Sequence, residues 1–215
     1  MALGRGLPLA LVAALALAGC GGGGKHETKA DAAGCIPLSQ PKPSQRTEPK
    51  PTRKLDPSKS YEVAVQTNCG TFTIQLAVKT SPATTASFVS LVRKGFYDGT
   101  IFHRIVPGFV IQGGDPTATG TGGPGYSTVD RPPASTRYTL GLVAMAKANT
   151  EAPGTSGSQF FVVTAKDAKL PPDYAVLGTV AKGLRVVERI GKLGDPATEQ
   201  PTEIVEIQKA VVHVG

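Results

Sequence analysis

Short segments of alternating apolar and polar residues, separated by Gly, Pro and Asn, dominate the chain from Tyr61 onward. Residues 61–66 and 71–76 alternate on either side of Asn68-Cys69-Gly70, which predicts two strands joined by a tight turn. Many short strands favour a closed antiparallel barrel, because closure removes the exposed edges of a sheet. Further strands are predicted at residues 101–105, 109–112, 140–146, 159–163, 175–180 and 204–213.

Two segments interrupt this pattern with helical spacing. Ser81-Pro82 is typical of a helix start, Phe88 and Leu91 then recur on one face, and Gly95 stands where a helix commonly ends. A second helix is predicted at residues 184–192. The expected architecture is therefore mainly β, a barrel capped by two α-helices.

The length of 215 residues and a hydrophobic content of 40% suffice for one sizeable core. We expect one folded domain over residues 61–215. Residues 1–20 are typical of an export signal, because Arg5 precedes an apolar stretch, residues 7–18, that is too short to span a bilayer.

That stretch ends in Leu17-Ala18-Gly19-Cys20, which resembles the bacterial lipobox. In this reading Cys20 is lipidated and anchors an exported protein to the outer face of the cell membrane. An ordinary signal peptide that is cleaved nearby is the alternative.

Residues 21–60 are rich first in Gly and then in Pro, Lys, Ser and Thr, which predicts a disordered linker. Much of the excess behind the formal net charge of +7 lies between Lys25 and Lys59. A basic tether argues against nucleic acid as the partner. It suits either a solvated linker or one that skims anionic head groups.

Two cysteines remain beyond the signal, Cys35 and Cys69, and an exported protein meets a disulfide-permissive environment. They either pair or stay as two free thiols. A metal site is not expected, because no Cys-x-x-Cys or His cluster accompanies them.

The run from Phe102 to Asp115 places Arg104, an aromatic ring and Gln112 along extended chain. Side chains two apart on a strand share a face, so such a run can aim a cation, an apolar pair and an amide into one groove. His103 reads as a buried hydrogen-bonding residue rather than an acid or base. Phe160 is expected in the core, facing opposite to Phe161.

Together with Gly157-Ser158-Gln159-Phe160-Phe161, this run resembles the signature of cyclophilins, the family of peptidyl-prolyl cis/trans isomerases. The resemblance covers Tyr61 to Val214 and implies an eight-stranded barrel with two capping helices and a substrate groove on its outer face. It implies Arg104 as the catalytic residue. The substrate-binding residues that it implies are His103, Phe109, Val110, Gln112, Thr121, Ala146, Lys147, Gln159, Phe161, Leu170 and Tyr174.

The function that follows is isomerisation of X-Pro bonds in proline-containing polypeptides, assisting the folding of exported proteins, with no cofactor or metal and as a monomer. A proline-peptide-binding chaperone or scaffold with little turnover is the alternative. A purely structural envelope lipoprotein would leave the groove unexplained.

Overall fold

The computed structural model describes residues 1–2, 30–31 and 34–215. Residues 3–20 of the expected signal, Cys20 included, lie outside the described residues. In the part that is described, no helix has both the length and the apolar character needed to span a bilayer. The elements in chain order are β1 (Tyr61–Thr67), β2 (Gly70–Leu76), α1 (Pro82–Arg93), β3 (Thr100–Ile101), β4 (Arg104–Val106), β5 (Val110–Gly113), β6 (Thr128–Val129), β7 (Leu142–Met145), β8 (Thr155–Ser156), β9 (Phe160–Val163), β10 (Val176–Lys182), α2 (Leu184–Ile190) and β11 (Glu206–Val214).

Nine strands form one antiparallel sheet in the order β3-β11-β1-β2-β10-β7-β9-β5-β4, and β6 and β8 form a separate pair. The sheet curls so far that Ile101 of the edge strand β3 bridges to Asp115, just beyond β5 near the other edge. The predicted strand 101–105 is divided because β3 pairs with β11 whereas β4 pairs with β5. Counted as one interrupted strand, β3 and β4 complete the eight-stranded barrel expected from the sequence.

Side chains alternate along β9 between two apolar clusters on opposite faces of the sheet. Phe160 and Val162 belong to the large core inside the barrel, while Phe161 and Val163 belong to a smaller cluster on the outer face. Successive residues of a strand point to opposite faces, so one short strand supplies both clusters. The prediction that Phe160 is a core residue is confirmed, since its side chain is 1% exposed.

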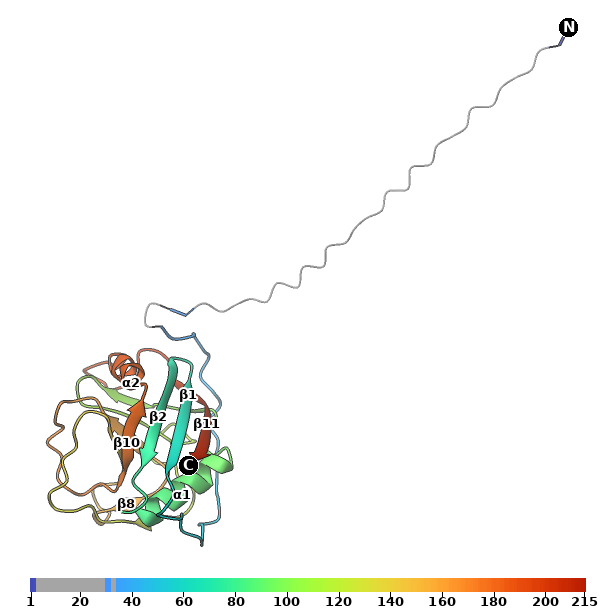
Figure 1. Cartoon of the computed structure of the whole chain (residues 1–215). Coiled ribbons are helices and arrows are strands. Elements are labelled where there is room, and N and C mark those ends of the chain that lie inside the picture. Colours follow the sequence, from blue (N-terminus) through green and yellow to red (C-terminus); the bar gives the residue numbers. More distant parts are fainter. Residues whose placement is uncertain (3–29, 32–33) are drawn as a thin grey trace.

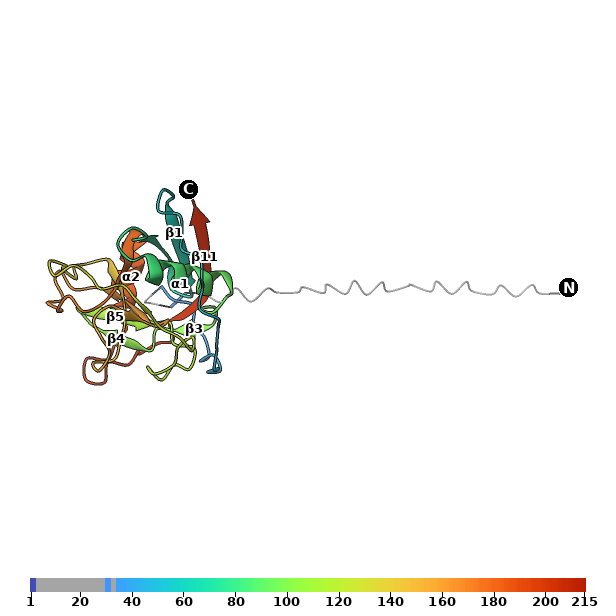
Figure 2. The ribbon, with the colours of Figure 1, turned by 90° about the horizontal axis from the view of Figure 1, so that it is seen from below.

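The two helices lie at opposite ends of the barrel (Figure 1), and Figure 2 shows α1 across its lower end. Pro82 occupies the first turn of α1 as expected. Ser81 stands at the N-cap, but its side chain makes no capping bond. The Asp130 carboxylate accepts instead from the Thr84 N–H at 2.6 Å, so the cap comes from a distant loop. The second helix ends at Ile190, two residues earlier than predicted.

Residues 35–60, which we call the strap, contradict the prediction of a disordered linker over this range. They contain no helix or strand, yet they follow the side of the barrel formed by β11 and β3 (Figures 1 and 2). The Ser44 N–H donates to the Pro116 carbonyl at 2.9 Å, and Arg46 donates to the carbonyls of Phe96 and Asp98. Composition suggested disorder because the strap has little to bury by itself. Some of its backbone N–H groups and the side chains of Arg46, Glu48 and Lys50 bond to the domain instead.

A disulfide joins Cys35 at the start of the strap to Cys69 in the turn between β1 and β2, which confirms the paired reading of these cysteines. Both residues are 1% exposed. Beside the disulfide, the Asn68 side chain donates to the carbonyls of Ile36 and Ile204 at 2.9 and 2.8 Å. The strap is thus fastened covalently at its first residue and by hydrogen bonds along its length.

Candidate functional site

The outer face of the barrel carries a row of side chains across β4, β5, β9 and β7. Arg104 pairs in register with Gln112, Gln112 with Phe161, and Phe161 with Ala144. Residues paired across neighbouring strands place their side chains on the same face. The row therefore brings a cation, an amide and an aromatic ring side by side.

A pocket of about 170 Å³, which we call the apolar pocket, opens along this row. Most of its lining residues are apolar or aromatic, and the Arg104 guanidinium, the Gln112 amide and the Lys147 ammonium supply polar groups. The sequence-predicted residues that line it are Arg104, Phe109, Val110, Gln112, Ala146, Lys147, Phe161, Leu170 and Tyr174.

The aromatic side of the apolar pocket is held rigid by a third ring. Phe161 and Tyr174 meet edge to face with their centroids 5.4 Å apart, and Tyr138 packs against both. The Tyr138 hydroxyl donates to the Tyr174 carbonyl at 2.7 Å and accepts from the Tyr174 N–H at 3.0 Å. Burial raises the pKa of Tyr138 to about 12, so it stays a neutral donor. The sequence reading missed Tyr138, because its hydrogen-bond partner Tyr174 lies 36 residues away.

Arg104 is held by an ion pair with Glu199, a residue that the sequence reading also missed. Its Nε donates to Glu199 Oε2 at 2.6 Å, and its Nη1 lies 3.4 Å from Gln112 Oε1. The Ile105 N–H donates to the Glu199 carbonyl at 2.9 Å, which fastens the Glu199 loop to β4. Because the ion pair uses Nε and Gln112 engages Nη1, the second terminal NH2 group of Arg104 makes no hydrogen bond to the described residues and remains available at the rim of the apolar pocket.

The hydrogen-bonded chain continues from the apolar pocket into a second and larger hollow. Gln112 Nε2 donates to Gln159 Oε1 at 3.1 Å, and Gln159 Nε2 donates to the Gly122 carbonyl at 3.0 Å. This second hollow, which we call the polar cavity, has a volume of about 760 Å³. Gln112, Ala146 and Lys147 line both spaces, so the two form one continuous groove. The predicted residues Thr121 and Gln159 line the polar cavity rather than the apolar pocket.

The glycine-rich loop of the polar cavity is organised by the buried carboxylate of Asp115. Its two oxygens accept from the Thr117 hydroxyl and from the N–H groups of Thr117, Thr119, Gly120 and Gly122, at 2.7 to 3.1 Å. Burial acts to raise the pKa of Asp115, but these hydrogen bonds prevail and lower it. The loop is therefore built around a stable anion.

His103 corrects the sequence reading in two respects. It lines neither the apolar pocket nor the polar cavity, because its imidazole lies beneath the loop, where a Cβ on Gly120 would stand 3.8 Å from Nε2. Neither ring nitrogen hydrogen-bonds to any of the described residues. Burial lowers the pKa of His103, although the Asp115 carboxylate acts in the opposite direction. His103 is a neutral packing residue under the groove.

Lys147 stands where the two spaces join. Its Nζ donates to the carbonyls of Ala148 and Glu151 at 3.2 and 3.1 Å, and it lies 5.7 Å from the centroid of the Tyr174 ring. These contacts hold the ammonium group against the loop that follows β7. The positive charge is thereby engaged by carbonyl oxygens and the Tyr174 ring at the junction of the two spaces.

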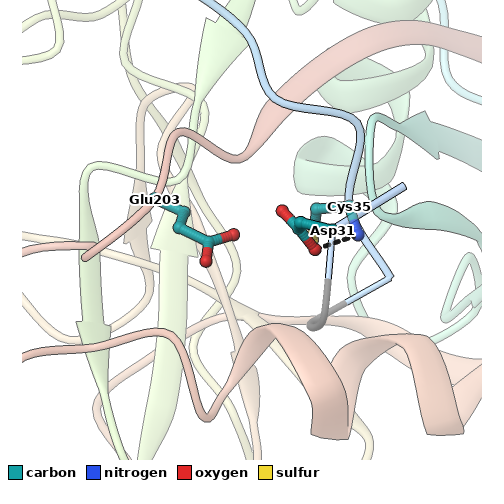
Figure 3. A group of neighbouring side chains, drawn as sticks. All are labelled: Asp31, Cys35 and Glu203. Carbon is teal, nitrogen blue, oxygen red and sulfur yellow. Dashed lines mark hydrogen bonds between the residues drawn. The ribbon is translucent and has the colours of Figure 1, made fainter. Parts of the chain in front are cut away.

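One group of side chains within the described residues has metal-ligating atoms close together: Asp31, Cys35 and Glu203 (Figure 3). The Cys35 sulfur is bonded to Cys69, so it cannot serve as a thiolate ligand. Asp31 Oδ1 accepts from the Cys35 N–H at 2.8 Å. Two carboxylates of this kind do not define a metal site, and we assign none.

The groove suits a peptide that contains proline. A pyrrolidine ring is compact and apolar, as the apolar pocket requires, and it brings its own tertiary amide to the rim where Arg104 stands. No side chain here is arranged as a nucleophile beside a base. The chemistry that the groove can supply is binding and electrostatic stabilisation.

Comparisons with known proteins agree with this geometry. The family described as cyclophilin type peptidyl-prolyl cis-trans isomerase/CLD matches residues 62–212. Peptidyl-prolyl cis-trans isomerase CYP18-2 of Arabidopsis thaliana is 38% identical over 155 residues, which are 70% of this chain and 93% of the relative. Peptidyl-prolyl cis-trans isomerase-like 1 of Neurospora crassa is 40% identical over 155 residues, with the same coverage of the two chains.

Solved structures show the same fold. A cyclophilin type peptidyl-prolyl cis-trans isomerase of Cryptosporidium parvum, crystallised in the presence of the dipeptide Ala-Pro, is 31% identical. It superposes with a TM-score of 0.65 over 71% of this chain and 98% of its own. The chain belongs to the cyclophilin-type peptidyl-prolyl cis-trans isomerases.

Proposed function

We propose that this protein isomerises X-Pro bonds in exported polypeptides, with Arg104 as the catalytic residue and the apolar pocket as the seat of the proline ring. The row of Arg104, Gln112 and Phe161 carries the proposal, because it sets a fixed cation beside an apolar pocket of about 170 Å³.

The reaction needs no covalent step. An amide resists rotation by about 18–20 kcal/mol because its nitrogen lone pair is delocalised into the carbonyl. A catalyst must bind the twisted amide more tightly than either planar form. As the bond twists, the prolyl nitrogen becomes pyramidal and accepts a hydrogen bond. The terminal N–H groups of Arg104, oriented by Glu199, are suited to donate it.

The remaining residues of the site divide between the two sides of the bond. Phe109, Val110, Phe161 and Leu170 would hold the ring, and Gln112 would hold the neighbouring backbone. Holding both sides keeps the X-Pro bond in the orientation in which the Arg104 donors can reach the twisted amide.

The test is the rate of cis-to-trans conversion of a short Ala-Pro peptide by the full chain and by Arg104→Ala. We expect kcat/KM to fall about 100-fold or more, because one preorganised donor is lost. Arg185→Ala, an exposed arginine on α2, is the matched control and should keep wild-type turnover. Peptide binding with no turnover in the wild type would instead support the alternative of a proline-recognition module.

Anchoring at the outer face of the cell membrane through lipidated Cys20 is part of the proposal. The apolar stretch and the sequence Leu17-Ala18-Gly19-Cys20 support it, and so does the Cys35–Cys69 disulfide, since such bonds persist in oxidising compartments. Mass spectrometry of the membrane-extracted protein tests it. A mass increase from acyl chains on Cys20 is expected, and an unmodified chain that still begins at Met1 would contradict it.

A further inference from the structure

The strap contributes to the groove although it lies outside the residues that match the family, 62–212. Its Gln45 and Thr47 line the polar cavity together with the glycine-rich loop, Gln112 and Gln159. The methyl group of Thr47 lies directly against Gly125, where a Cβ would approach it to 2.8 Å. One wall of the groove therefore comes from this N-terminal segment.

Anchors on either side fix these two residues. The N–H groups of Ser44 and Glu48 donate to the carbonyls of Pro116 and Pro124, both at 2.9 Å. Between them Arg46 reaches the carbonyls of Phe96 and Asp98, and the Glu48 carboxylate pairs with Lys94 at 2.6 Å. In extended chain, alternate side chains face opposite ways. The side chains of Arg46 and Glu48 bond to the domain, so those of Gln45 and Thr47 face the cavity.

The unengaged groups of the polar cavity are neutral. The side chains of Gln45 and Thr47 are both exposed. None of the hydrogen bonds among the described residues uses the Gln45 amide or the Thr47 hydroxyl. The two charges of the wall are already engaged: Lys147 donates to backbone carbonyls, and the Glu151 carboxylate accepts from the Ala148 N–H at 2.7 Å. An amide and a hydroxyl with free donors and acceptors match a neutral polar side chain, such as that of Gln, Asn or Ser.

We propose that Gln45 and Thr47 are specificity-determining residues, which select a neutral polar side chain of the substrate within a few residues of the isomerised proline. The inference rests on the proposed function, because the polar cavity is continuous with the apolar pocket through Gln112, Ala146 and Lys147.

The test uses two peptide series in which Gln, Ala, Leu or Glu stands two residues before or two residues after one proline. The wild type should turn over the Gln peptide with a kcat/KM about three- to tenfold above that of the Ala peptide in one series, the effect of one or two neutral hydrogen bonds. Gln45→Ala/Thr47→Ala should reduce this preference to less than about twofold.

Gln40→Ala/Thr52→Ala is the matched control, since it removes the same two residue types from exposed positions of the strap that do not line the cavity. The control should keep the preference for the Gln peptide. Equal denaturation midpoints of the wild type and both double variants would show that the strap stays in place. An unchanged preference in Gln45→Ala/Thr47→Ala, or a wild type without any preference, would overturn the inference. Absence of turnover on every peptide would contradict the isomerase itself, and calorimetric affinities of the same peptides would then decide the selection separately.

Discussion

Glu199 determines where the Arg104 guanidinium points. The backbone of Glu199 has a positive φ of 60°, and its N–H donates to the Asp195 carbonyl at 2.8 Å, so a tight turn presents the carboxylate. With 43% of its side chain exposed, the Glu199 partner of the ion pair adds little to stability. Its effect is orientation, because it occupies Nε and leaves the terminal NH2 groups, one of them bonded to Gln112, at the rim of the apolar pocket.

Glu199→Gln should therefore lower kcat about three- to tenfold with little change in KM, since a neutral amide accepts a weaker hydrogen bond than a carboxylate. Glu199→Asp should recover part of the loss. The measurement is steady-state turnover of an Ala-Pro peptide. Glu188→Gln, an exposed change on α2, is the control, and equal kcat in both variants would refute the role of Glu199.

His103 predicts a dependence of stability on pH. Burial lowers its pKa in the folded protein, so below about pH 6.5 the unfolded chain binds the proton more readily. The free energy of unfolding should fall as the pH falls through about 6.5, until the lower folded pKa is passed. Urea midpoints across this range measure the slope, which His103→Gln should reduce and His213→Gln, at an exposed position, should retain. If His103→Gln leaves the pH dependence of the urea midpoint unchanged, a group other than His103 causes it.

At the scale of elements, the loop between β5 and β6 behaves as a shell around one carboxylate. Asp115 is 0% exposed and accepts from four backbone N–H groups and one hydroxyl. A Cβ on Gly122 would come within 2.0 Å of Asp115 Oδ1, so this close approach requires glycine. The loop that bounds the polar cavity therefore depends on Asp115 for its shape.

Asp115→Asn should destabilise the protein by about 2–3 kcal/mol, because the new NH2 group faces N–H donors and leaves them unsatisfied. Amide hydrogen exchange at Thr119, Gly120 and Gly122 should accelerate more than exchange in β1 or β11. Asp56→Asn removes a carboxylate from an exposed turn with Ser58 and serves as the control. Loop exchange at the wild-type rate would contradict the role of Asp115.

At the scale of the whole molecule, the disulfide makes the strap part of the folded unit. It joins residues 34 apart in the sequence. In the chain-entropy treatment, closing a loop of that length stabilises the fold by about 3–4 kcal/mol. Cys35→Ser/Cys69→Ser should lower the free energy of unfolding by that amount in chemical denaturation. A loss below about 1 kcal/mol would mean that the strap contributes little to cooperative folding.

The sequence predicted the parts of the site that lie close together in the chain. Arg104 and Gln112 stand on the two strands of one hairpin, so strand alternation alone places them on one face. Glu199 and Tyr138 escaped prediction because their partners are distant in sequence. The strands β6 and β8 have two residues each, too few to show any period. The order of the strap was not predicted, because composition shows only how much apolar surface a segment can bury by itself. It does not show which hydrogen-bond partners the folded domain provides.

The disulfide also determines the N-terminal boundary of the folded unit. Similarity to the family starts at Glu62, and a fragment cut there would retain every residue that matches the family. It would carry Cys69 as an unpaired thiol, a group that exchanges with disulfides and can link two copies. It would also expose the carbonyls of Phe96, Asp98, Pro116 and Pro124 that the strap now occupies. Dimers of such a fragment would be products of the cut, because the folded unit starts no later than Cys35.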